Sequence, residues 1–389
     1  MDETGDVARQ EELIKRSVKA ILRNQSPNGA IVASPDFSQY HFCWLRDGSF
    51  SAYALDVAGE HEASARYHEW VRAAVHRISA VIDEAIARHY AGHDVGALEM
   101  PPARFTLEGS VIVDGWPNFQ IDGYGTWLWS LGRHLRSAPS AEFTKDLRDA
   151  VARVGRYLEA FALTPCYDVW EESGSAVHTS TLASVYGGLV SAAGLLDDTR
   201  YLETAAAVKA TVAKSGSRLG YFNKSSENDD VDASTLWLDN PFHVVDSSDS
   251  NLTRSVSMIS DRLTLDGGLR RYPTDTYFGS GAWPVLTASL GWHYASAGNA
   301  GEARRCLDWV AERFDADGHL GEQFGGDRRD LRHYSEWLDR WGPPAADLTW
   351  SHAMYVILAD AIARGTGGPE SGLAKTRTGT SDTGPEVST

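Results

Sequence analysis

The sequence has little cysteine, and its cysteines show no spacing that would tie them together. Three occur, Cys43, Cys166 and Cys306, with no CxxC pair among them. So sparse and odd a set argues against a disulfide framework and against a thiolate zinc site. Residues 1–10 also lack the apolar core of a signal peptide. We therefore expect a soluble protein of the reducing cytoplasm.

Positive charge and long hydrophobic runs are scarce as well. The 36 Lys and Arg residues are outnumbered by 53 Asp and Glu residues, giving a net charge of -17 with no acidic block. Such a surface repels phosphate backbones, so a nucleic-acid partner is not expected. No run approaches the length needed to cross a bilayer, so no membrane partner is expected either. A neutral substrate fits this surface better.

Alternating β-branched runs are rare, apart from short pieces such as 111–113, and helical periodicity dominates. In the first helix an apolar stripe is formed by Leu13, Ile14, Val18, Ile21 and Leu22. The same periodicity predicts helices over 8–24, 48–58, 61–92, 122–137, 141–163, 178–195, 199–214, 230–240, 248–262, 281–298, 300–314 and 349–364. The sequence therefore predicts an all-α protein of about twelve helices.

The connections between these helices alternate between short and long. The long ones are rich in Gly, Trp, Asp and Pro, and they cover 25–47, 95–121, 164–177, 215–229, 263–280 and 315–348. Long loops in a compact domain usually carry function, and each of these ends at a helix start. This pattern favours an α-barrel over residues 1–366 with its site at one end. An α-solenoid would need a fixed-period repeat, and none is visible.

The last residues, 367–389, are rich in Gly, Ser, Thr, Pro and Lys and have almost no large apolar side chains. Such a composition cannot bury enough apolar surface to order the chain. We expect a disordered C-terminal tail.

Tryptophan is abundant, with 13 residues, and many of them lie in the long loops beside polar residues. These are Trp44, Trp116, Trp170, Trp283 and Trp341. Aromatic faces stack on the apolar face of a sugar, while neighbouring charged groups bind its hydroxyls. A sugar site is one interpretation, and ordinary core packing is the other.

Two loop segments carry candidate catalytic carboxylates. Glu171 and Glu172 follow a tryptophan, whose apolar contact can raise a carboxyl pKa into the range of a general acid. Alternatively, they only complement the dipole of the next helix. Glu322 follows a glycine turn and is weak evidence alone, because paired carboxylates matter only when the fold brings them together across a sugar-sized gap.

Six segments in order resemble glycoside hydrolase family 15, which contains glucoamylases, glucodextranases and bacterial trehalases. They are 40–47 (YHFCWLRD), Trp116 with 119–125 (FQIDGYG), 167–172 (YDVWEE), 269–277 (LRRYPTDTY) with Trp283, 321–324 (GEQF) and 348–352 (LTWSH). The resemblance implies an (α/α)6 barrel of two concentric rings, in agreement with the helix count.

The resemblance also implies the site residues of an inverting glucosidase. Glu171 would be the general acid and Glu322 the general base, with Tyr40 beside the reaction centre as an auxiliary. The implied substrate-binding residues are Trp44, Arg46, Asp47, Trp116, Trp170, Glu172, Arg271 and Trp283. Two carboxylates supply the proton transfers, so no metal or cofactor is expected.

Two departures from the family pattern bear on the substrate. The chain starts directly on a barrel helix, without the β-sandwich of many bacterial members or a starch-binding module. Phe278 also stands where glucoamylases usually have a second tyrosine after Tyr277, which leads to the hypothesis that Tyr40 is freer to contact the water or Glu322. We expect a small α-glucoside substrate, with α-1,6-linked isomaltose favoured over glucoamylase or trehalase activity. A phosphorylase would need a cationic pocket and no base, and a non-catalytic sugar-binding barrel would not need both glutamates.

Overall fold

The computed structural model describes residues 3–138, 141–326 and 329–365, and the expected tail at 367–389 lies outside these ranges. The α-helices are α1 (Glu3–Arg23), α2 (Leu45–Val57), α3 (His61–Arg77), α4 (Ser79–Tyr90), α5 (Asp122–Ser137), α6 (Lys145–Phe161), α7 (Thr179–Leu196), α8 (Arg200–Leu219), α9 (Ser250–Leu263), α10 (Pro284–Ser296), α11 (Ala300–Ala311), α12 (Leu331–Trp341) and α13 (Thr349–Arg364). The 3₁₀ helices are η1 (Ser38–Tyr40), η2 (Ala97–Glu99), η3 (Ala233–Leu238) and η4 (Tyr277–Gly279).

Strands are short in the described part of the chain. β1 (Cys43–Trp44) pairs with β2 (Arg104–Phe105), and β3 (Thr264–Leu265) pairs with β4 (Gly268–Leu269), both antiparallel. The first pair joins the two loops that precede α2 and α5. The strands therefore fix loops to one another and do not form a sheet layer.

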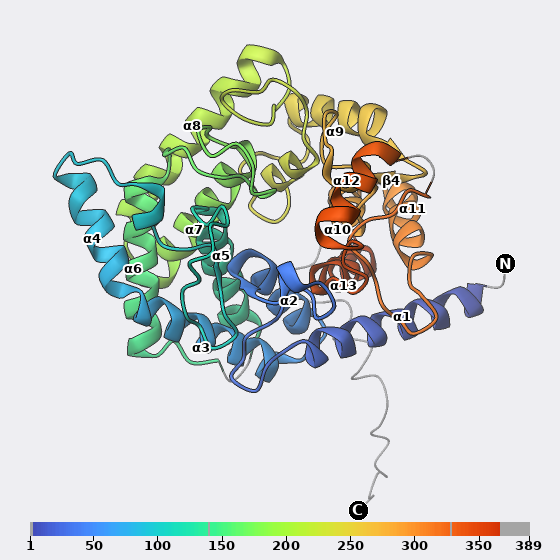
Figure 1. The fold of residues 1–389 in the computed structure, drawn as a ribbon, viewed down its shortest axis with the longest axis horizontal. Coiled ribbons are helices and arrows are strands. Elements are labelled where there is room, and N and C mark those ends of the chain that lie inside the picture. Colours follow the sequence, from blue (N-terminus) through green and yellow to red (C-terminus); the bar gives the residue numbers. More distant parts are fainter. Residues whose placement is uncertain (1–2, 139–140, 327–328, 366–389) are drawn as a thin grey trace, which may run out of the picture.

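The helices form two concentric rings (Figure 1). The inner ring runs α2, α5, α7, η3, α10 and α13, and α13 packs back on α2 to close it. Around it lie α1, α3, α6, α8, α9 and α11, which alternate with the inner elements along the chain. This is the (α/α)6 barrel that the sequence predicted. α4 and α12 are additions to the two rings.

The inner helices are largely buried, and apolar or small side chains accordingly predominate in their sequences. Every residue of α2 is buried. Where α5 and α7 cross, a side chain at Gly125 would begin 2.3 Å from the backbone oxygen of Ser184, so only glycine permits this approach. α7 is long and apolar enough to span a membrane, contrary to the expectation that no run is, but 67% of it is buried within the barrel.

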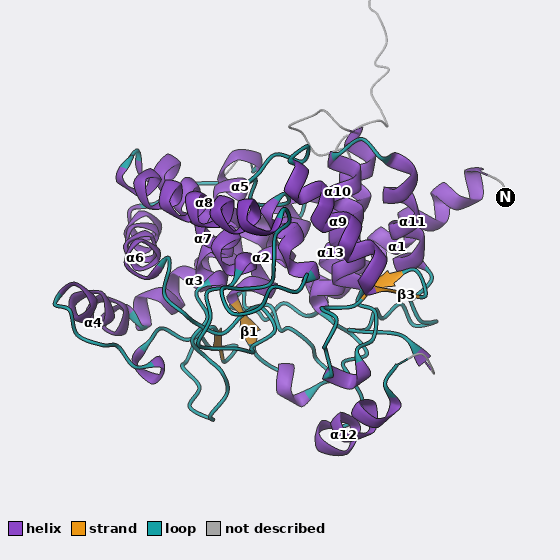
Figure 2. Ribbon diagram, turned by 90° about the horizontal axis from the view of Figure 1, so that it is seen from above, coloured by secondary structure: helices purple, strands orange, loops and turns teal. Residues whose placement is uncertain are grey.

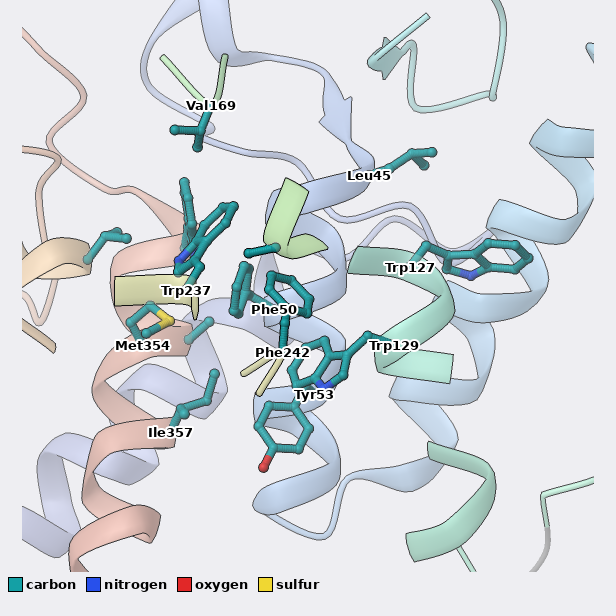
Figure 3. Packing of buried hydrophobic residues seen from close by; sticks show 14 of the residues in the cluster. Leu45, Phe50, Tyr53, Trp127, Trp129, Val169, Trp237, Phe242, Met354 and Ile357 are labelled. Carbon is teal, nitrogen blue, oxygen red and sulfur yellow. The ribbon is translucent and has the colours of Figure 1, made fainter. Parts of the chain in front are cut away.

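The centre of the barrel is filled by aromatic side chains (Figure 3). Phe50 of α2 stacks on Trp350 of α13, with ring centroids 5.5 Å apart, and lies at the same distance from Trp237 of η3. Trp129 of α5 closes the group at 5.7 Å from Phe50. The barrel axis is therefore solid, and the pocket can open only at an end.

Two of the expected helices differ in the structure, and one helix was not expected. The helix expected over 61–92 is two helices, α3 and α4, broken at Ile78, whose φ of -97° and ψ of 13° leave the helical region. The helix expected over 230–240 is the six-residue 3₁₀ helix η3, which fills an inner-ring position with a single short piece. α12 lies inside the expected loop 315–348, so that loop is not structureless.

The six inner elements all begin at the same end of the barrel. The six long loops of the sequence each lead into one of them, and Figure 2 shows these loops gathered on one side of the helical layer. Helix N-termini and long loops are therefore concentrated at this end. The expectation that the loops crowd one face of the barrel is confirmed.

Candidate active site

A pocket of about 550 Å³ opens at the loop end of the barrel. Its size is in the range of small-molecule sites. All eleven residues that the sequence singled out line it: Tyr40, Trp44, Arg46, Asp47, Trp116, Trp170, Glu171, Glu172, Arg271, Trp283 and Glu322. They come from five of the six long loops, so the barrel brings together residues nearly 300 positions apart in the sequence. Phe278 is fully buried behind Tyr277.

Glu171 is presented by a tight turn. The side chain of Asp168 accepts hydrogen bonds from the backbone N–H groups of Trp170 (3.0 Å) and Glu172 (2.9 Å). Glu171 itself has a φ of 67°, in the left-handed region that non-glycine residues seldom adopt. Backbone strain of this kind persists where the surroundings hold it, and it is common at functional sites. The turn thus aims Glu171 into the pocket.

The carboxylate of Glu171 accepts hydrogen bonds from three N–H donors. Trp44 Nε1 lies 2.5 Å and Gln120 Nε2 3.1 Å from Oε1, and Trp116 Nε1 donates to Oε2. Burial raises the pKa of Glu171, and Arg46 together with these donors opposes the rise. The net result is a carboxyl group that holds its proton to higher pH than an ordinary glutamate does. That is the property a general acid needs.

Glu322 also lines the pocket and lies in an extended segment. Its N–H donates to the carbonyl of Ala345 (2.9 Å), and two residues later Phe324 pairs with Ala282. The side chain is fully buried, and burial raises the pKa of Glu322 to about 7 against a hydrogen bond from Tyr40. A carboxylate that gains its proton near pH 7 is a strong base for a carboxylate.

Tyr40 connects Glu322 to the rest of the pocket. Its hydroxyl donates to Glu322 Oε1 at 2.8 Å and lies 2.8 Å from the hydroxyl of Tyr277. The expected contact of Tyr40 with Glu322 is thus present, although the Tyr40 hydroxyl also has a tyrosine partner, which Tyr277 supplies in place of residue 278. Burial raises the pKa of Tyr40 well above its usual value, so the hydroxyl stays protonated and acts as a donor to Glu322.

Two arginines in the pocket are held by carboxylates. Arg46 bonds to Asp122 at 3.2 Å and to Asp47 at 3.2 Å, and Arg271 pairs with Glu172 at 3.2 Å and with Asp275. Their positive charges are thereby neutralised. In Arg46 it is Nε that lies 3.2 Å from Asp47 Oδ2, whereas the buried Nε of Arg271 has no hydrogen-bond partner in the described residues.

Comparison with known proteins agrees with this geometry. The model of the family described as glycosyl hydrolases family 15 matches residues 8–323. The chain belongs to this family. It is 37% identical to the isomaltose glucohydrolase of Kribbella flavida over 371 residues, which cover 92% of this chain and 95% of that protein.

Solved structures of the family show the same architecture. A glycosidase variant in complex with glucose is 36% identical, with a TM-score of 0.89 over 93% of this chain and 99% of that one. The glucoamylase of Saccharomycopsis fibuligera has the same fold at 15% identity, with a TM-score of 0.71 over 91% and 95% of the two chains. This family 15 protein is thus an inverting glycoside hydrolase that acts on glucosides.

Several pocket residues of this family 15 enzyme were missed from the sequence. Gln120 bonds both Glu171 and Arg46, and Lys224 supports the turn of Glu171 from below, bonding Asp168 and Asp232 at 2.9 Å each. Tyr277 was noted only for its neighbour Phe278. Two further missed residues, Trp337 and Arg340, lie on α12 and line the pocket beside Trp341, which was among the loop tryptophans named from the sequence. A motif could flag Gln120, which lies in the 119–125 block, but the partners of Lys224 are distant in sequence.

Proposed function

We propose that the enzyme is an exo-acting α-glucosidase that releases β-glucose from the non-reducing end of small α-glucosides, with α-1,6-linked isomaltose as the favoured substrate. In this proposal Glu171 protonates the glycosidic oxygen while Glu322 takes a proton from the attacking water. A single displacement from the opposite face inverts the anomeric configuration. The 37% identity with an isomaltose glucohydrolase supports the linkage.

The observation that carries the size preference is the aromatic closure of the pocket mouth. Trp341 of α12 stacks on Trp116, with ring centroids 5.6 Å apart and planes at 25°. Trp337 lies next to it at 5.0 Å. All three rings line the pocket, so they would hinder a long polysaccharide more than a disaccharide. We infer that α12 restricts the substrate to short chains.

Trp116 couples this closure to catalysis. Its indole N–H donates to Oε2 of Glu171 and its ring forms half of the stack with Trp341. Oε2 is the oxygen left with this single donor, so it is the one that can protonate a glycosidic oxygen. Substrate entry would replace the indole N–H at Oε2, which releases that oxygen for proton donation.

The charges of the pocket argue against a phosphorylase. Arg46 and Arg271 are each paired with two carboxylates, so neither offers a free positive charge to phosphate. The pocket also contains Glu322, and a phosphorolysis site would not need this carboxylate as a base. A hydrolytic reaction accounts both for the neutralised arginines and for the presence of Glu322.

A disaccharide panel with anomer detection tests the proposal. We expect isomaltose to be cleaved with a higher kcat/KM than maltose or trehalose, without dependence on phosphate. Proton NMR of fresh product should show β-glucose before mutarotation. Preferred cleavage of maltose or trehalose would reject the α-1,6 preference while keeping the mechanism, and initial α-glucose would reject the mechanism itself.

A further inference from the structure

A second cluster of polar side chains is buried at the barrel end opposite the active site. It consists of Asp56 in the last turn of α2, His68 in the middle of α3 and His134 near the end of α5. Asp56 follows Asp47 of the pocket by nine residues of helix, which is roughly 14 Å along the axis. We infer that Asp56, His68 and His134 form a binding site for a zinc-like divalent metal ion that stabilises the barrel.

The three side chains converge on one point. Each offers one ligand atom, and the three atoms all lie within 4.8 Å of one another. His134 Nδ1 lies 2.9 Å from Oδ1 and 3.1 Å from Oδ2 of Asp56. A zinc ion placed about 2.0–2.2 Å from each ligand needs ligand atoms a little over 3 Å apart, so only small side-chain shifts are required.

His68 provides the independent evidence for a ligand. It is 2% exposed, and neither ring nitrogen has a hydrogen-bond partner in the described residues. A buried polar group without a partner destabilises a protein, and such groups in a native protein need an explanation. A neutral imidazole nitrogen carries the lone pair that a metal ligand requires, so a metal ion would give His68 its missing partner.

The donor set selects the class of metal. Two imidazoles and one carboxylate are the ligands of zinc and similar transition-metal ions, whereas calcium and magnesium prefer oxygen ligands alone. Three protein ligands leave a fourth position for a water molecule. Because all three ligands are buried and come from three different helices, the ion would tie the outer helix α3 to the inner helices α2 and α5.

Further residues around the carboxylate hold it in place. His61 Nδ1 lies 2.9 Å from Asp56 Oδ1, and Ser64 Oγ donates to Oδ2 at 2.7 Å. Hydrogen bonds of this kind orient metal ligands and are a regular part of metal sites. The rival interpretation is a hydrogen-bond network of Asp56 without a metal. It explains His61, Ser64 and His134, but it leaves both nitrogens of His68 unused.

Metal analysis of the whole chain tests the site. The protein is produced with zinc in the medium, dialysed, and its zinc content is measured by mass spectrometry. We expect about one zinc ion per chain, lost in His68→Gln. The matched control is His319→Gln, which alters the exposed group Asp315, Asp317 and His319 and should keep the zinc. Zinc retained in His68→Gln but lost in His319→Gln would overturn the assignment.

A second measurement decides the matter even if His68→Gln fails to fold. The wild-type chain is unfolded, stripped with a chelator and refolded with cobalt(II), which gives strong visible absorption in a four-coordinate site. We expect one equivalent to bind and to raise Tm, since a ligand that binds only the folded state stabilises it. No absorption and no change in Tm would overturn the inference. Hydrolytic activity should be the same with and without metal, so the outcome is independent of the proposed function.

Discussion

The two pocket carboxylates differ through the hydrogen bonds that each receives. Burial raises the pKa of both, but Glu171 accepts hydrogen bonds from three N–H donors, while Glu322 accepts one from the Tyr40 hydroxyl and a long one, 3.5 Å, from the Gln323 amide. Family motifs in the sequence located both residues. Their pKa shifts could not be predicted, because the donors come from Trp44, Gln120 and Tyr40, which only the closed barrel brings near them.

Replacing each carboxylate separately should distinguish the acid from the base. Glu171→Gln is expected to lower kcat on a disaccharide by about 10²–10⁴-fold, because the leaving group then departs without a proton. On a glucosyl fluoride, which needs little protonation, the loss should be much smaller. Glu322→Gln should lose activity on both substrates. Equal losses for the two variants on the fluoride would contradict the assignment of Glu171.

The pH dependence should report on Glu322 and Tyr40. The base must be ionised, and with a pKa of about 7 it is lost as pH falls through 7, so kcat/KM should decline on the acid side of neutrality. The Tyr40 hydroxyl stabilises the ionised form. Tyr40→Phe should therefore raise the pKa of Glu322 and move the acid limb to higher pH. Tyr277→Phe, which removes the partner of Tyr40 and no donor to Glu322, is the control with a smaller shift. An unmoved limb in Tyr40→Phe would show that the hydroxyl does not act on the base.

At the scale of elements, the periodic helices were predicted well and the irregular ones were not. Inner and outer helices carry clear apolar patterns, whereas η3 is only six residues long and takes the place of an inner helix through its contacts with α7 and α10. α12 had usable signals: Asp330 caps it by accepting from the N–H groups of Arg332 and His333, and Gly342 ends it with a φ of 81°. The Gly, Asp and Pro residues around this helix are typical of loops, so the whole segment was predicted as a loop.

Opening the mouth at α12 should change the preferred chain length. Trp341→Ala removes the stack on Trp116, a contact worth about 0.5–1.5 kcal/mol, so KM for isomaltose should rise roughly two- to tenfold. The ratio of kcat/KM for isomaltotriose to that for isomaltose should increase at the same time. Arg332→Ala, on the exposed side of the same helix, is the control and should change neither value. A ratio that stays constant in Trp341→Ala would remove α12 from substrate selection.

At the scale of the whole molecule, the pocket lies at one end of the barrel and the buried contact of Asp56 with His134 at the other. Twelve ring positions and the crowding of long loops at one face follow from the sequence, because periodicity and loop length record which helices pair. The buried polar contacts across the rings do not follow from it. Asp56 with His134, and Lys224 with Asp168, join segments whose spacing carries no signal. These contacts join loops and helices that are distant in the sequence.

Replacing Lys224 tests how much one of these contacts stabilises the folded protein. It lies 2.9 Å from both Asp168 and Asp232 and is almost fully buried, and Asp232 in turn accepts the indole N–H of Trp170. Lys224→Met leaves two buried carboxylates without a cation, which should lower the free energy of unfolding by about 3–5 kcal/mol. Burial would raise the pKa of Asp232, but Lys224 lowers it, so this carboxylate contributes stability above its unfolded pKa in the wild type.

Without the lysine the folded-state pKa of Asp232 should rise instead, so the cost of Lys224→Met should be largest near neutral pH and shrink as the pH falls and the carboxylates gain protons. Urea unfolding at several pH values measures this difference. The triple variant Lys224→Met, Asp168→Asn, Asp232→Asn carries no buried charge in the cluster and should recover part of the stability at neutral pH. A cost that does not change with pH would show that Lys224 stabilises the fold by packing on Tyr272, 3.8 Å from its ring centre, and not by its charge.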